Sequence, residues 1–185
     1  MKLIIHALLG IALGVISAYI MISLAPEFLW VHNGVWKTSL VAGSEKADPY
    51  TKAIVAKNYL YVLNKSEAIY FIADSDGERK LDRSCDYKIV GKDLPARWWS
   101  ITVYGEDNFL IPNEHKIYSI TSANVVKNGD LWEVYISKDP KGKNWIPLRG
   151  EGNFYITLRL YNPEKIVYDK IAEIELPKIM KEVCR

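Results

Sequence analysis

Two alternating runs of residues, 97–104 and 154–161, carry the side chains best suited to binding chemistry. Successive side chains of a β-strand point to opposite faces, so each run has an apolar face and a face of aromatic and hydroxyl groups. The aromatic and hydroxyl face consists of Trp98, Ser100, Thr102 and Tyr104 in the first run, and of Tyr155, Thr157, Arg159 and Tyr161 in the second. If the strands are neighbours, they form a surface that could bind a glycan or a peptide by ring stacking and an arginine contact. The commoner alternative is that these aromatics pack against other elements, with Arg159 buried and paired.

Catalytic and metal-binding patterns are missing from the sequence. Nucleophilic catalysis would need a serine or cysteine with a histidine and a carboxylate. Outside the apolar N-terminal run the only histidines are His32 and His115, and neither lies in a GxSxG or Cys-His setting. The Asp74-x-Asp76-Gly77 segment lacks the spacing and the closing glutamate of a calcium loop, so we interpret it as a turn. We therefore expect no catalytic residues, no metal site and no cofactor.

The composition is that of a folded domain with an appendage. Apolar residues make up 49% and aromatic residues 12% of the 185 residues, which is ample for a core and excludes disorder. The 24 basic and 22 acidic side chains give a formal charge of +2 and are interspersed. Nucleic-acid binding would favour a basic stripe, so we expect no nucleic-acid partner.

Residues 3–24 form an apolar run without a full charge. As a helix this run would be roughly 33 Å long, enough to cross a hydrocarbon core of about 30 Å. The alternative is a cleavable signal peptide, but the run is longer than the ~7–15 apolar residues of a signal sequence, and Pro26 follows the best cleavage site. We favour an uncleaved anchor at residues 1–25, with the N-terminus in the cytoplasm because Lys2 supplies the positive end. Residues 26–185 would then be an exported domain.

Two features of the sequence bear on association. Gly10, Gly14 and Ala18 are spaced four residues apart on one face of the apolar run. Such small-residue spacing allows a helix-mediated homodimer, although glycine and alanine are also simply common in membrane spans. Cys85 and Cys184 are the only two cysteines. If the domain is exported, we expect them to form a disulfide, whereas a frayed C-terminal end would leave them as free thiols.

The binding side chains must be positioned by short strands. We expect a hairpin of 97–104 and a returning strand that Pro112 closes, and further strands at 68–73, 87–91, 117–126, 131–137 and 154–161. Asn128-Gly129 suits a type I′ turn. One short helix should begin with Asp48 as N-cap and Pro49 in its first turn, and end near residues 62–64. A loop at 138–152 and a coil-rich tail with a short helix near 165–172 complete the chain.

Seven or so short strands separated by turns predict a mainly β protein. The fold class is an antiparallel β-sandwich or jelly-roll-like domain with one N-terminal transmembrane helix and one short soluble helix.

Three segments carry a family resemblance: LPARWWSITVYGEDNFLIPN at 94–113, NWIPL at 144–148 and FYITLRLYNP at 154–163. Together with ADPYTKA at 47–53 and EAIYF at 67–71, they resemble the short membrane-anchored bacterial members of the domain of unknown function 1214 family. The resemblance implies a jelly-roll-like β-sandwich, no defined reaction and no transferable catalytic residues. The best matches to the family motif, and hence the candidate binding residues, are Trp99, Tyr104, Asn144, Trp145, Arg159 and Tyr161.

These observations predict a protein of the bacterial inner membrane, with a single span and a periplasmic β-sandwich. We expect this domain to bind or scaffold a partner, either an envelope protein or a glycan. The alternative is an accessory hydrolase or a glycan- or lipid-modifying enzyme with a site around Arg159. An acid beside Arg159 in an open pocket would favour the enzyme.

Overall fold

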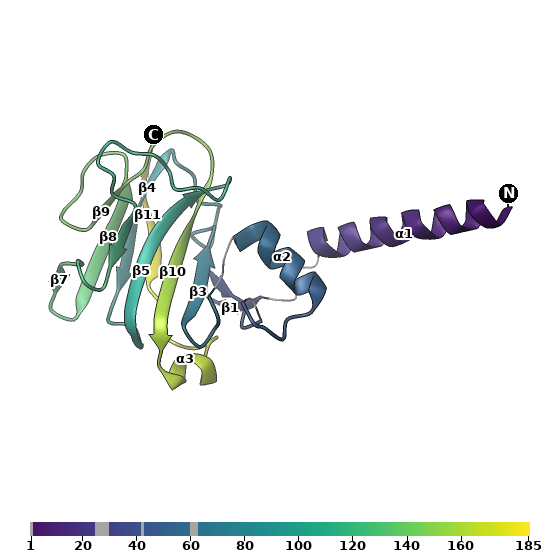
Figure 1. The fold of residues 1–185 in the computed structure, drawn as a ribbon. Coiled ribbons are helices and arrows are strands. Elements are labelled where there is room, and N and C mark those ends of the chain that lie inside the picture. Colours follow the sequence, from purple (N-terminus) through teal and green to yellow (C-terminus); the bar gives the residue numbers. More distant parts are fainter. Residues whose placement is uncertain (1, 25–29, 42, 60–62) are drawn as a thin grey trace. The chain divides into compact units, whose positions relative to one another are not determined.

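The computed structural model describes residues 2–24, 30–41, 43–59 and 63–185, without the side chains of residues 24 and 57–59 (Figure 1). The chain forms two compact units. One comprises residues 1–30 and 39–65, and the other comprises Val31–Thr38 and Ser66–Arg185.

The first unit contains two helices. Helix α1, Lys2–Leu24, is long and apolar enough to cross a membrane, and no residue of its apolar stretch is buried inside the protein. Helix α2, Pro49–Tyr59, is capped as predicted: Oδ1 of Asp48 accepts hydrogen bonds from the backbone amides of Tyr50 (2.9 Å) and Thr51 (3.1 Å). The predicted end of this helix falls partly on residues 60–62, which lie outside the described residues.

A six-stranded antiparallel sheet forms one layer of the second unit. Its strand order is β1-β2-β3-β10-β5-β6. The strands are β1 Val31–Asn33, β2 Trp36–Thr38, β3 Ala68–Ala73, β10 Phe154–Pro163, β5 Ala96–Gly105 and β6 Ser119–Thr121. The central pairing joins β10 to β5 and β3, so strands far apart in the sequence lie side by side (Figure 1).

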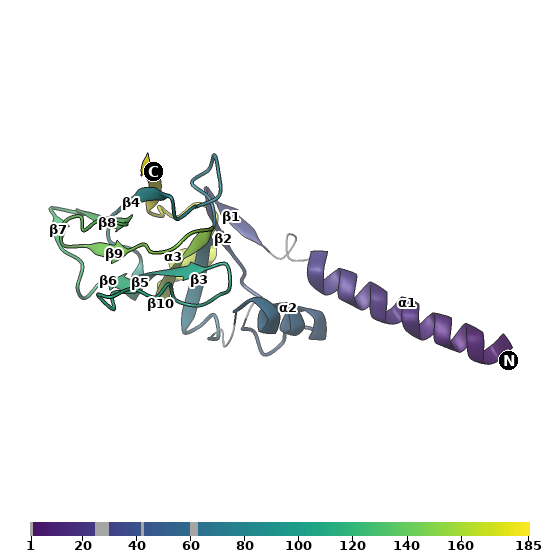
Figure 2. The ribbon, with the colours of Figure 1, turned by 90° about the horizontal axis from the view of Figure 1, so that it is seen from above.

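A second sheet has the order β11-β4-β8-β7, with β9 parallel to β8. Its strands are β11 Lys178–Cys184, β4 Cys85–Gly91, β8 Leu131–Ser137, β7 Lys127–Asn128 and β9 Trp145–Pro147. The short helix α3, Lys165–Asp169, follows β10 and confirms the helix predicted in the tail. Figure 2 shows β4 and β8 in one layer and β3, β5 and β10 in the other.

The core lies between the two sheets. Alternate residues of β10 are fully buried, and ring pairs join the layers: Trp99 with Trp132 at 4.7 Å between centroids, and Tyr87 with Phe154 at 5.5 Å. Large aromatic side chains from both layers thus fill the space that two apolar faces must share. The predicted fold class, a mainly β antiparallel sandwich with an N-terminal apolar helix, is confirmed.

Several local predictions were wrong. The segment after residue 105 turns as expected, but only Leu110 bridges back to Tyr104, so there is no returning strand in this described part of the chain. Strand β5 instead pairs with β10 and β6. The predicted strand at 117–126 is reduced to β6, and the loop at 138–152 contains β9.

The C-terminal tail is also a strand rather than coil. Strand β11 pairs antiparallel with β4, and this pairing supplies backbone hydrogen bonds that the weak apolar pattern of the tail did not indicate. The turn between β7 and β8 lies one residue later than predicted, because Asn128 pairs with Leu131 and Gly129-Asp130 form the loop. Gly129 has a φ of 62°, which suits the first position of such a loop.

Candidate functional site

The two polar-aromatic faces lie next to each other on the outer side of the six-stranded sheet. The register pairs Tyr155 with Tyr104, Thr157 with Thr102, Arg159 with Ser100 and Tyr161 with Trp98. Residues directly opposite on adjacent strands point to the same face. The apolar residues between them, such as Leu158 and Ile101, point into the core and are fully buried. We call these eight paired residues the outer face.

Arg159 lies in the middle of the outer face. It is part-exposed, and its guanidinium donates hydrogen bonds from Nη1 to Oγ1 of Thr102 (3.0 Å) and from Nη2 to the hydroxyl of Tyr104 (2.7 Å). Its Cζ lies 5.4 Å from the ring centroid of Tyr104 and 5.6 Å from that of Tyr70. Two tyrosine rings and two hydroxyl groups therefore hold the guanidinium in place.

Two aromatic pairs lie along the same strands. The rings of Tyr104 and Tyr155 stack with centroids 5.5 Å apart, and Trp98 contacts Tyr161 edge-on at 4.9 Å. All four side chains are part-exposed. The Tyr155 hydroxyl donates to Oδ1 of Asn108 (2.9 Å). Burial, with a contribution from neighbouring Tyr104, raises the pKa of Tyr155 to about 12, so this phenol keeps its proton at neutral pH.

Charge on the outer face is unbalanced. Among the described residues, Arg159 forms no ion pair, and no group of three or more His, Cys, Asp or Glu could hold a metal ion. The hydrogen-bond acceptors of the guanidinium are hydroxyls, which are neutral at pH 7. The arrangement is suited to binding an uncharged ring or an anion.

The structure brings together only three of the six candidate residues. Tyr104, Arg159 and Tyr161 share the outer face, whereas Trp99 is 2% exposed and faces the core. Trp145, 7% exposed, donates its indole N–H to the backbone oxygen of Ser137 (3.1 Å). The residues that match the family motif thus include both core and surface positions.

Asn144 has a structural environment of its own. Its Oδ1 accepts from the amide of Val126 (2.7 Å), and its Nδ2 donates to the backbone oxygens of Val126 (2.7 Å) and Glu133 (2.8 Å). Asn144 thus fixes the segment before β7 against β8. It also lines a cleft of about 320 Å³ beside the β7–β8 hairpin, together with the exposed side chains of Leu131 and Lys143.

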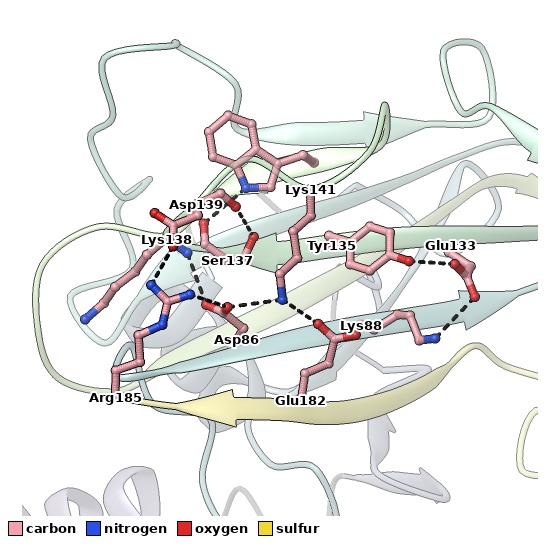
Figure 3. Close-up of polar contacts among 11 residues, drawn as sticks. Asp86, Lys88, Glu133, Tyr135, Ser137, Lys138, Asp139, Lys141, Glu182 and Arg185 are labelled. Carbon is pink, nitrogen blue, oxygen red and sulfur yellow. Dashed lines mark hydrogen bonds and ion pairs between the residues drawn. The ribbon is translucent and has the colours of Figure 1, made fainter.

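A polar cluster that the sequence did not indicate surrounds Asp86 on β4 (Figure 3). The Asp86 side chain is 3% exposed and lies between two cations: Lys141 at 3.2 Å and Arg185 at 3.3 Å. Its Oδ1 also accepts from the backbone amide of Lys138 (3.2 Å). Lys141 contacts Glu182 at 2.6 Å, so the cluster joins β4, β11 and the loop after β8. We call it the C-terminal clasp.

The disulfide predicted between Cys85 and Cys184 is present beside the clasp. The two Cα atoms lie 3.9 Å apart, and no described cysteine is free. The backbone amide of Arg185 donates to the oxygen of Ser84 (2.9 Å), and its guanidinium also contacts Asp139 at 2.5 Å. The hydrogen bond from the Arg185 guanidinium holds the pKa of Asp139 below its usual range. The hydrogen bond to Glu182 raises the pKa of Lys141.

Tyr70 is the residue of the outer surface that sequence reasoning missed. The run 68–73 is almost continuously apolar, which predicted a central strand covered on both sides. Tyr70 is the part-exposed residue within it, and it lies directly opposite Arg159. A tyrosine, with its polar hydroxyl, within an otherwise apolar run was the available indication, but the strand partner of Tyr70 could be found only from the register.

The fold and the outer face define this chain as a two-sheet antiparallel β-sandwich protein with an apolar N-terminal helix. It belongs to the family described as "Protein of unknown function (DUF1214)", whose match covers residues 67–165. The resemblance seen in the sequence is therefore confirmed. No curated protein matches this chain.

Solved structures similar to the chain include two bacterial proteins. The VPA0106 protein from Vibrio parahaemolyticus is 25% identical, with a TM-score of 0.61 over 75% of this chain and 36% of its own. An uncharacterized protein from Burkholderia cenocepacia is 15% identical, with a TM-score of 0.48 over 91% of this chain and 41% of its own. This chain thus spans well under half the length of either relative.

Proposed function

We propose that this protein is anchored in the bacterial inner membrane by α1 and binds an envelope partner through the outer face of its periplasmic β-sandwich. The observation that supports binding most strongly is the register of β5 and β10, which gathers two aromatic pairs and Arg159 on one part-exposed surface. Tyrosine, tryptophan and arginine are the side chains that binding surfaces favour. Lectin domains use jelly-roll sandwiches too, which is an analogy of fold alone.

The membrane anchor is supported by the length and composition of α1. An apolar helix of this length fits the hydrocarbon core, and its exposed apolar side chains, such as Leu3 and Leu13, would be costly in water. The disulfide supports an oxidising compartment for the domain, because such bonds are rare in the cytosol. Helix pairing through Gly10, Gly14 and Ala18 is part of the same proposal, because small residues let two helix backbones approach closely and open space lies in front of both glycines.

Binding is favoured over the enzymatic alternative by the surroundings of Arg159. A hydrolase would place a carboxylate beside this arginine within a pocket. In the described ranges Arg159 donates hydrogen bonds to two hydroxyls and lies over two tyrosine rings, and it forms no ion pair with a carboxylate. Recognition therefore accounts for the outer face better than catalysis does.

Topology can be tested with alkaline phosphatase fused after Arg185. The fusion should be active, because that enzyme folds only after export. The intact mass of the purified protein should retain residues 1–25. An inactive fusion would contradict the orientation, and loss of those residues would show a signal peptide instead of an anchor.

Binding can be tested by capture of envelope material on the detergent-solubilised full chain. The wild type should retain material that a Trp98→Ser/Tyr161→Ser variant does not. A Met180→Ser/Val183→Ser variant, changed at exposed positions of β11, is the matched control and should behave as the wild type. Equal retention by the face variant and the wild type would refute the outer face as the binding surface.

A further inference from the structure

Arg159 is a cation without a matching anion among the residues that the structure describes. A guanidinium has five N–H donors, and within the described part of the chain Arg159 donates two hydrogen bonds to side chains, both to hydroxyls. Removing a charge from water costs free energy unless an opposite charge compensates for it. The fold has already brought Arg159 partly out of water, so an anion of a ligand would find a fixed, partly desolvated partner.

The aromatic pairs flank Arg159 along the strand direction. Tyr161 lies two residues to one side of Arg159 and Tyr155 four residues to the other. At about 3.3 Å per residue the backbone positions of Tyr155 and Tyr161 are roughly 20 Å apart. A ligand that contacts both pairs must be extended, with flat apolar faces at its two ends and a negative group between them.

We propose that the ligand of the outer face is an acidic oligosaccharide, whose carboxylate binds Arg159 and whose sugar rings stack on the two aromatic pairs. This inference rests on the proposed function and specifies its ligand. The planar fork of a guanidinium matches a carboxylate through two parallel hydrogen bonds. Tyrosine and tryptophan present an apolar ring face with a polar tip, which suits a sugar ring that has an apolar face and a hydroxyl rim.

Isothermal titration calorimetry on the full chain in lipid nanodiscs tests the proposal. The probes are an oligogalacturonate and the same oligosaccharide with every carboxylate methyl-esterified, which removes the charge and keeps the rings. The acid form should bind, and the ester should bind roughly 10- to 100-fold more weakly, as expected for loss of a charged hydrogen bond.

Variants separate the contribution of Arg159 from that of the rings. Arg159→Gln should weaken the acid form to the level of the ester, and Arg159→Lys should recover part of the loss. Arg97→Gln is the matched control, because Arg97 is an exposed arginine on the same strand β5. Tyr161→Ser should weaken both forms. Unfolding midpoints verify that the variants fold, and the acid–ester comparison on the wild type does not depend on them.

The possible outcomes of the titrations distinguish the acidic ligand from the ring-stacking surface. Equal binding of acid and ester, unchanged in Arg159→Gln but weakened in Tyr161→Ser, would overturn the acidic ligand and leave the ring-stacking surface in place. Binding of neither form would also overturn it, and the envelope capture with the Trp98→Ser/Tyr161→Ser variant would then decide separately on the proposed function. Capture of an acidic peptide in place of a glycan would likewise contradict the inference.

Discussion

Asp86 and Arg185 form an ion pair of 3.3 Å across 99 positions of the sequence, between β4 and the residue that follows β11. The carboxylate is 3% exposed, whereas the guanidinium is 47% exposed. The nearly buried Asp86 carboxylate therefore needs nearby cations to compensate for its lost hydration. Arg185 is one of these cations and Lys141 is the second. Strand β11 buries only Ile179, so the clasp and the disulfide add to its backbone pairing with β4 in holding this edge strand in place.

Breaking the disulfide should destabilise the domain. In the chain-entropy model, closing a loop of about 100 residues contributes about 4.7 kcal/mol, an upper value for Cys85–Cys184 with its separation of 99 residues. We expect a lower urea midpoint for the reduced protein and for Cys184→Ser. Reductant should not affect Cys184→Ser further. An unchanged midpoint on reduction would show that β11 is held without the bond.

Asp86→Asn should cost about 1.5–3 kcal/mol, because charged hydrogen bonds are lost and two cations are left with fewer partners. Urea unfolding at pH 7 measures the change. Asp93→Asn is the control, since Asp93 is 73% exposed and pairs with Lys127 at the surface, where such pairs contribute about 0–1 kcal/mol. Equal effects of the two substitutions would contradict the importance assigned to the clasp.

Acid should weaken the domain partly through Asp139. Its folded pKa lies below the ordinary value of 3.8, because Arg185 hydrogen-bonds to its ionised form. Its stabilisation is therefore fully present above the unfolded pKa and is lost as the pH falls through the lower folded pKa. Unfolding free energies measured from pH 6 to pH 2 should fall less steeply below pH 4 in Asp139→Asn. Parallel pH profiles would refute this contribution.

Tyr155 should titrate far above an ordinary tyrosine. Burial raises its pKa from 10.0 to about 12, so the folded state favours the protonated phenol. Its stabilising contribution is present below pH 10 and is lost as the pH rises from 10 through 12. NMR of ¹³C-labelled tyrosine, assigned with Tyr155→Phe, resolves this titration. A titration midpoint near 10 would contradict the burial of the Tyr155 side chain.

Local periodicity predicted the strands that matter most for the site. The alternation in 154–161 gave both faces of β10, and Asp48-Pro49 gave the start of α2, because side-chain direction and capping depend on neighbours in sequence. The partners of β5 could not be predicted in this way. The turn signal after residue 105 predicted a hairpin with the following segment, whereas β5 pairs with β10, about fifty residues further along the chain, and its apolar face packs against the second sheet through Trp99 and Trp132.

The outer face and the clasp differ in how far the sequence indicated them. The residues of the outer face were visible as two patterns, and only their adjacency came from the structure. The clasp depends on Asp86, Lys141 and Arg185, which are ordinary charged residues in three distant segments. No local pattern distinguishes a buried aspartate from an exposed one when its partners arrive from elsewhere in the chain.

The most direct test of the account is photo-crosslinking in intact cells, with benzoylphenylalanine placed at position 161 on the outer face or at position 180 on β11. The protein should form adducts with an envelope component from position 161 and none from the control position 180, although Met180 is the more exposed of the two side chains. Adducts from position 180 and none from 161 would contradict the outer face as the surface through which this protein acts.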